Sequence, residues 1–176
     1  MTTTRLTGYD RTMLRLMNNP RGRRIHATAT RRRLVVAVHA VLTAAIGALL
    51  VHLFLAPGEP VWALVAAGLL LLPWMVATGI INSATRGLLE LRERILDERQ
   101  AAERRRVLAR AHRVTMLLLL VAVAALLTAG AIDGHAPRAY AAPVLVAVLV
   151  VHWLMPLWVA GLTARDEPAE DEIAGA

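Results

Sequence analysis

The fold is decided by residues 34–56, which read LVVAVHAVLTAAIGALLVHLFLA. This stretch contains no Asp, Glu, Lys or Arg. A helix of this length extends about 34 Å, and the hydrocarbon core of a bilayer is about 30 Å thick. The sequence therefore predicts a transmembrane helix at these residues.

Three further stretches repeat this pattern. Formally charged side chains are also absent from residues 60–82, 114–132 and 140–163, so four spans are predicted. Hydrophobic residues make up 57% of the 176-residue chain, whereas an average soluble domain contains about 45–50% apolar residues. We therefore expect an all-α integral membrane four-helix bundle over residues 34–163.

Arginine is distributed unevenly around these spans. All 20 basic residues are Arg, and they cluster before the first span and between the second and third spans. Arg165 follows the fourth span, and Arg138 alone lies in a loop on the other side. Because cytoplasmic loops carry the excess of positive charge, we expect a multi-pass protein of the plasma membrane, here a bacterial inner membrane, with both termini in the cytoplasm.

The basic residues also suit two competing interpretations. The net charge of +7 would suit nucleic-acid binding, but the Arg residues flank apolar spans and accompany no recognisable nucleic-acid-binding fold. Arg31, Arg32 and Arg33 follow Thr30 and precede an apolar run, as in a twin-arginine export signal. No small-residue cleavage site with a polar mature start follows near Ala56, and three more spans do, so an uncleaved first span accounts for the same residues.

The segments outside the spans have distinct compositions. Residues 1–33 form a basic tail, which begins with a short amphipathic segment, and residues 164–176 form an acidic tail that we expect to be disordered. Residues 83–113 contain one Gly and no Pro, and carry opposite charges at i,i+4 spacing. Since spans two and three run in opposite directions, we predict a cytoplasmic helical hairpin that reverses near Asp97.

This predicted hairpin offers two kinds of contact surface. Its apolar residues recur at helical spacing and would suit a homodimer or a cytoplasmic protein partner. Its basic residues, with those before the first span, would suit phosphates of an anionic inner leaflet. A solvated connector accounts for the same pattern. The apolar residues, called the Leu/Ile stripe below, are Leu88, Leu91 and Ile95, and the candidate phosphate contacts are Arg31, Arg32, Arg33, Arg104, Arg105 and Arg106.

The sequence Leu96-Asp97-Glu98-Arg99-Gln100 is followed by an Arg-rich helix that enters the third span. It resembles a segment of small, uncharacterised bacterial membrane proteins with four spans. The resemblance covers mainly residues 86–115 and implies no activity. Some of these proteins look like membrane partners of transcriptional regulators, which implies a protein partner for the cytoplasmic hairpin.

His152 is the main polar candidate within the membrane. It lies near the middle of the fourth span, beside Trp153, and Pro156 frees its backbone carbonyl. An ionisable group at this depth is a functional candidate, and it would give a small transporter or channel subunit a polar site between two hairpins. A neutral imidazole bonded to a neighbouring helix is the simpler interpretation, because a proton relay would want an acidic partner and no span contains one.

Catalytic and cofactor sites are not indicated. The chain has no Cys and none of the common motifs for nucleophilic, metal-dependent or phosphate-binding catalysis. His39 and His52 share the first span but lie roughly 140° apart around a helix, which disfavours a haem site. We therefore predict a non-enzymatic membrane protein without cofactor or metal, which acts as an interaction, regulatory or scaffold component through its Arg-rich cytoplasmic face.

Overall fold

The computed structural model describes residues 7–17, 28–55, 58, 60–93, 96–132 and 136–164. These residues form five helices and no strand: α1 (Gly8–Met17), α3 (Ala29–Leu55), α4 (Val61–Ala84), α5 (Glu98–Ile132) and α6 (Ala136–Thr163). In this part of the chain, α3, α4, α5 and most of α6 are long and apolar enough to cross a membrane. The prediction of an all-helical chain with four membrane-spanning helices is confirmed, and the fold is compatible with a multi-pass membrane protein.

Short polar sequences determine where two of the helices begin. At the start of α5, the Gln100 amide donates to Asp97 Oδ1 at 2.6 Å, and the Asp97 amide donates to Gln100 Oε1 at 3.2 Å. Thr7 and Asp10 form the same reciprocal cap at the start of α1. Each pair satisfies amides that a helix N-terminus otherwise leaves without a partner. The start of α5 therefore coincides with the position at which the sequence predicts the chain to reverse.

The connection between α4 and α5 differs from the helical hairpin predicted over residues 83–113. At the end of α4, the Gly87 amide donates to the Asn82 carbonyl. The Arg86 amide donates to the Ser83 carbonyl. This pairing closes a helix through residues with left-handed backbone, and Arg86 (φ 53°) and Gly87 (φ 70°) both adopt that conformation. The first arm of the hairpin is therefore a series of turns, whereas the second arm is helical and continues as α5 into the third span.

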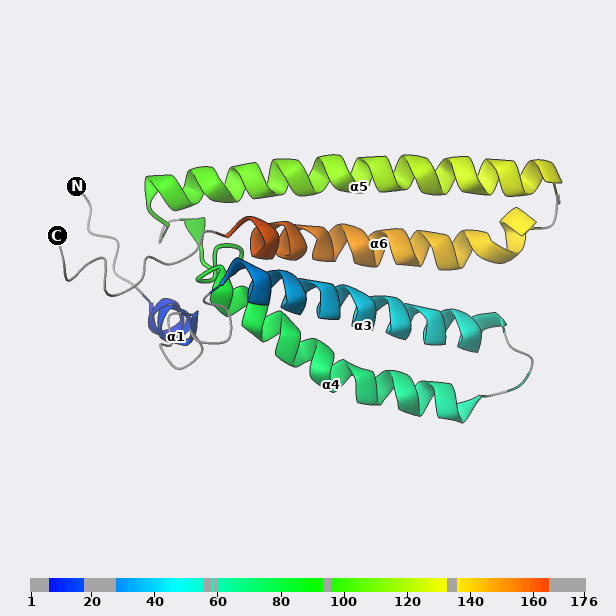
Figure 1. The fold of residues 1–176 in the computed structure, drawn as a ribbon, viewed down its shortest axis with the longest axis horizontal. Coiled ribbons are helices and arrows are strands. Elements are labelled where there is room, and N and C mark those ends of the chain that lie inside the picture. Colours follow the sequence, from blue (N-terminus) through cyan, green and yellow to red (C-terminus); the bar gives the residue numbers. More distant parts are fainter. Residues whose placement is uncertain are drawn as a thin grey trace.

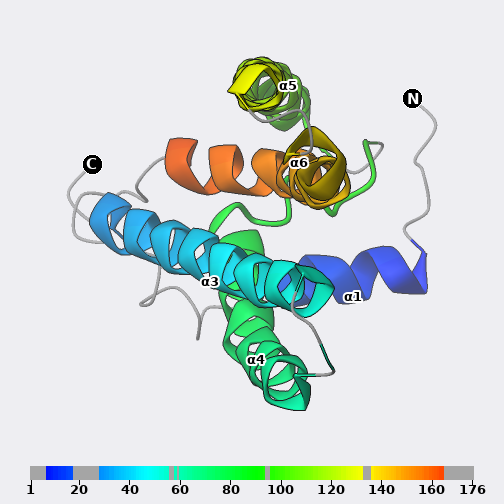
Figure 2. The ribbon, with the colours of Figure 1, turned by 90° about the vertical axis from the view of Figure 1, so that its right-hand side faces the viewer.

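The four long helices pair as two antiparallel hairpins, α3 with α4 and α5 with α6 (Figure 1). The hairpins meet mainly through α3 and α6, so the helices follow the order α5, α6, α3, α4 and do not close into a square (Figure 1, Figure 2). We call the end where α3 and α5 begin and α4 and α6 end the arginine end, and the opposite end the far end. The short helix α1 lies at the arginine end, while α4 diverges from α3 toward the far end (Figure 1).

Buried side chains are concentrated at the arginine end. One cluster joins the turns after α4 to α5 and α6, and contains Leu88, Val107, Ala111, Met155, Val159 and Ala160. A second cluster joins α3, α4 and α6, and contains Val36, Ile81 and Leu157. Toward the far end, many large apolar side chains are exposed, as expected for helices that face lipid.

Candidate functional site

The structure places His152 on an exposed face of α6. The neighbouring Trp153 is 73% exposed, and Pro156 is partly buried. Because the His152 side chain is exposed, the two hairpins of the described chain do not enclose it. This placement gives no support to a transport site between the hairpins, the alternative that the sequence suggested.

The Leu/Ile stripe lies largely inside the chain. Leu88 is 7% exposed and Leu91 is 4% exposed, while Ile95 lies outside the described residues. Leu88 packs against α5 and α6, and Arg104 Nη1 donates to the Leu91 carbonyl at 2.8 Å, which holds the turns against α5. The surface expected to bind a partner is therefore buried within the chain at Leu88 and Leu91.

The arginines expected to contact lipid phosphate have different roles. Arg32 is 6% exposed, and its Nη2 donates to the Ala164 carbonyl at 2.6 Å, at the C-terminal end of α6. A cation is favourable there because the helix dipole places negative charge at that end. Arg104 is partly buried and holds the Leu91 carbonyl. The other four are exposed: Arg31, Arg33, Arg105 and Arg106.

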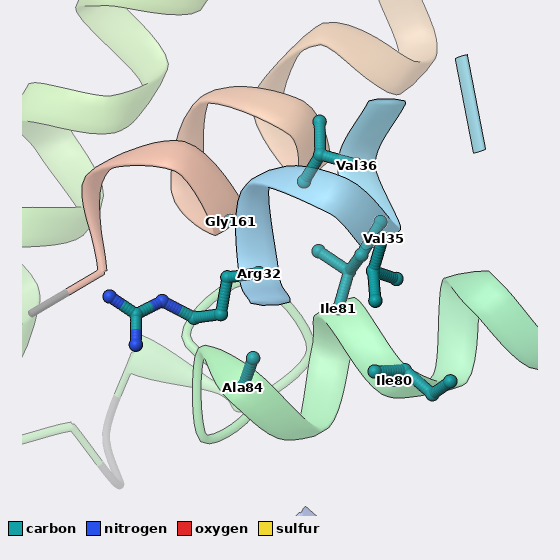
Figure 3. A pocket seen from close by; sticks show the side chains of 7 residues that line it. All are labelled: Arg32, Val35, Val36, Ile80, Ile81, Ala84 and Gly161. Carbon is teal, nitrogen blue, oxygen red and sulfur yellow. The ribbon is translucent and has the colours of Figure 1, made fainter. Parts of the chain in front are cut away.

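Three helices approach one another closely beside Arg32. Figure 3 shows Arg32, Val36, Ile81 and Gly161 around a narrow crevice. A methyl group on Gly161 would lie 2.8 Å from Val36 Cγ2 and 3.0 Å from Ile81 Cγ2. Glycine therefore permits α6 to contact α3 and α4 at this level. The crevice has no room for a water molecule, so it is a packing junction and not a ligand site.

A polar cluster centred on the buried His39 joins the same three helices. It consists of His39 and Thr43 of α3, Trp74 and Thr78 of α4, and Trp158 of α6. His39 is fully buried, with Nε2 2.9 Å from Thr78 Oγ1 and Nδ1 accepting from Trp158 Nε1 at 2.9 Å. Trp74 Nε1 donates to Thr43 Oγ1 at 2.9 Å, and the Trp74 and His39 ring centroids are 4.9 Å apart. The cluster therefore connects α3 to both α4 and α6.

These hydrogen bonds define the state of the His39 ring. The Trp158 indole can only donate, so His39 Nδ1 acts as an acceptor and carries no proton. The neutral ring then has its proton on Nε2 and donates to Thr78 Oγ1, whose hydroxyl donates to the Trp74 carbonyl at 2.9 Å. The Thr43 hydroxyl donates to the His39 carbonyl at 2.8 Å. Both ring nitrogens are satisfied within the cluster, which makes it a packing element with no polar group left for a ligand.

The sequence favours His152 over His39 as a polar candidate, whereas the structure buries His39 and exposes His152. A signal for the cluster is present in the sequence, because spans one and two each contribute two of its members at a spacing of four residues. Residues four apart share one face of a helix, and polar side chains on facing surfaces of adjacent spans tend to bond. The contribution of α6 could not be predicted in this way, since it depends on the order of the helices.

The short helix α1 contacts the connection between α4 and α5. Asp10 is 1% exposed, and its Oδ1 lies 3.9 Å from Arg92 Nε. The Arg92 guanidinium also lies 5.4 Å from the centre of the Tyr9 ring. Met17 packs so closely on Gly87 that a methyl group there would lie 2.8 Å from Met17 Cγ. The amphipathic segment predicted in the basic tail is thus a helix that contacts its own chain.

An open basic groove, the α5–α6 groove, lies at the arginine end between the first turns of α5 and the last turns of α6. Its volume is about 340 Å³, and a buried apolar floor is provided by Val107 and Val159. Its charged residues belong to one face of α5 and comprise three guanidinium groups and one carboxylate. Guanidinium groups bind phosphate oxygens in pairs of parallel hydrogen bonds. The lining residues are Arg99, Ala102, Glu103, Arg106, Val107, Arg110, Val159 and Thr163.

Comparison with known proteins does not assign this chain to a family. No family model matches it, and no significant match is found to a curated protein or to a solved structure. The chemistry of the chain's own residues is therefore the basis for a functional proposal.

Proposed function

We propose that this chain is a non-enzymatic multi-pass membrane protein that binds anionic lipid phosphate in the α5–α6 groove. Through this contact it would act at the cytoplasmic face as an interaction, regulatory or scaffold component. The observation that carries the proposal is the groove itself, in which Arg99, Arg106 and Arg110 line one side and buried valines form the floor. A lipid bound there would contact the Arg side chains at the rim with its anionic headgroup and would contact the apolar floor below them.

The level of the groove along the helices supports this proposal. Arg110 of the groove lies about 6 Å along α5 from residue 114, where the charge-free third span begins. Thr163, on the other side of the groove, is the last residue of α6. Lipid phosphates lie just outside the hydrocarbon core. A phosphate could therefore contact the groove while its acyl chains lie beside the apolar part of α5.

The orientation expected from the arginine distribution adds further support. If the arginine end is cytoplasmic, as the positive-inside rule predicts, the groove faces the leaflet that carries anionic lipid. The exposed Arg31, Arg33 and Arg105 add a diffuse attraction to the same surface. The burial of Leu88 and Leu91 favours lipid over a protein docked on the Leu/Ile stripe.

The proposal is tested by lipid binding to the purified full-length protein in a neutral detergent. The probe is short-chain phosphatidylglycerol, with phosphatidylcholine as the zwitterionic comparison, and bound lipid is counted by native mass spectrometry. The double variant Arg106→Gln with Arg110→Gln should weaken phosphatidylglycerol binding about tenfold or more, because it removes two guanidinium groups that hydrogen-bond the phosphate directly, and a hydrogen bond to a charged group contributes about 1.5–3 kcal/mol.

The matched control is Arg105→Gln with Arg113→Gln, which removes the same charge from exposed positions of α5 that do not line the groove. This pair should change binding less than about threefold. Excess inorganic phosphate is then added as a competitor. It should displace the lipid if the groove recognises phosphate alone, and it should not if binding also requires contact with the apolar floor. Equal losses in the two double variants, or equal binding of the two lipids, would refute a specific site in the groove.

A further inference from the structure

The position of His152 points to a second binding surface, within the membrane. In the apolar Tyr140–Thr163 segment of α6, His152 lies about 18 Å from one end and about 17 Å from the other. The hydrocarbon core is about 30 Å thick. The exposed imidazole of His152 is therefore held near the middle of the membrane.

In this position lipid tails cannot satisfy the imidazole. A neutral imidazole has one N–H donor and one acceptor nitrogen, and within the described residues the His152 ring makes no hydrogen bond. His39 shows the opposite arrangement in the same membrane domain, since both of its ring nitrogens have partners. A polar group without a partner in hydrocarbon is strongly disfavoured. A single copy of the chain therefore leaves the His152 ring without a hydrogen-bond partner among the described residues.

The residues around His152 have the spacing of a helix contact. Leu145 and Leu149 are exposed on α6, and with His152 they recur at intervals of four and three residues. This is the spacing of side chains that line the contact between two packed helices, and a single polar residue in such a contact commonly sets the register of the pair. We call Leu145, Leu149 and His152 the His152 stripe.

We propose that the His152 stripe is the contact surface for a second copy of this chain, and that the two His152 rings hydrogen-bond to each other across a two-fold axis. A second copy is the partner that the chemistry favours, because an interface with two-fold symmetry places the same residues opposite one another. One imidazole then supplies the donor and the other the acceptor. The described part of α6 has no charged residue between Tyr140 and Thr163 that would demand an oppositely charged partner helix.

The first test measures association of the full-length protein in lipid vesicles by energy transfer between labelled copies, over a dilution series in lipid. His152→Leu should weaken association about tenfold, and His152→Asn, which keeps a donor and an acceptor, should restore most of it. The matched control is His52→Leu, the same substitution at an exposed histidine of α3, which should leave association unchanged.

The second test uses the absence of cysteine from the chain. Leu149→Cys, on the stripe, should form a disulfide-linked dimer when vesicles are treated with a mild oxidant. Ala147→Cys is also exposed but lies two residues away, on the other side of α6, and should link poorly. The proposal is overturned if the protein stays monomeric at every dilution, or if Ala147→Cys links as efficiently as Leu149→Cys.

Discussion

His39 and His52 lie on the same helix, α3, toward opposite ends of the molecule. At the arginine end, His39 is fully buried and hydrogen-bonded at both ring nitrogens. At the far end, His52 is exposed beside the Trp62 ring, with centroids 5.4 Å apart. The tryptophans repeat this contrast, because Trp158 donates to His39 whereas Trp62 is 61% exposed.

The difference shows where the specificity of the fold arises. Lipid tails are as apolar as leucine, so burying an apolar side chain between helices gains little over leaving it in lipid. Hydrogen bonds and close contacts do discriminate between helix arrangements. The arginine end has both, in the His39 cluster and at Gly161. It therefore fixes which helices are neighbours, while the far end mainly supplies length and hydrophobicity.

Among the substitutions that test this difference between the two ends, His39→Ala should lower the free energy of unfolding most. The substitution leaves the Trp158 N–H without its acceptor, removes the hydrogen bond that the Thr78 hydroxyl accepts and opens a cavity, so the free energy of unfolding should fall by about 3 kcal/mol. Unfolding by sodium dodecyl sulfate in mixed micelles measures this change. His52→Ala is the control and should change stability by less than about 0.5 kcal/mol. Equal losses at the two positions would contradict the proposed difference between the ends.

Gly161→Ala should have an intermediate effect. The added methyl group meets Val36 and Ile81 at 3.0 Å or less, and overpacking of this kind typically costs about 1–3 kcal/mol. The same unfolding measurement applies. At Gly68 of α4 the added methyl group meets nothing within 4 Å, so Gly68→Ala should raise stability by up to about 1 kcal/mol through helix propensity. A gain in both variants would show that the three-helix junction can relax.

Trp158→Phe should have the smallest effect of the three. It keeps an aromatic ring but removes the donor to His39 Nδ1, at an expected loss of about 1 kcal/mol. The control is Trp62→Phe at the far end, where the side chain is largely exposed and the change should be less than about 0.5 kcal/mol. If Trp158→Phe is neutral, the His39 ring is held by α4 alone.

Much of the fold could be predicted because a membrane span depends on its own residues. The spans predicted at residues 34–56 and 60–82 correspond to α3 and α4, with α3 beginning five residues earlier and the other boundaries within two residues. Length and the absence of charge are local properties, which the sequence displays directly. The angle of roughly 140° predicted between His39 and His52 agrees with one buried and one exposed ring.

The partners of the candidate residues are harder to predict. The apolar character of Leu88 and Leu91 is evident in the sequence. Whether this apolar face contacts another protein or its own chain depends on how α4 ends. In the structure, Arg86 and Gly87 turn the chain so that Leu88 packs against α5 and α6. The depth of His152 is likewise clear from its place in the span. Its exposure depends on which helices pack beside α6, which no local pattern contains.

The contact between α1 and Arg92 has a consequence for biosynthesis. α1 precedes Arg92 and Gly87, which it contacts, by two spans in the chain, so the ribosome makes α1 first and its contact residues only after both spans have been translated. Until then the ring of Tyr9 and the carboxylate of Asp10 have no Arg92 to meet. Docking of α1 therefore has to wait until the α3–α4 hairpin has been translated, although α1 is synthesised before that hairpin.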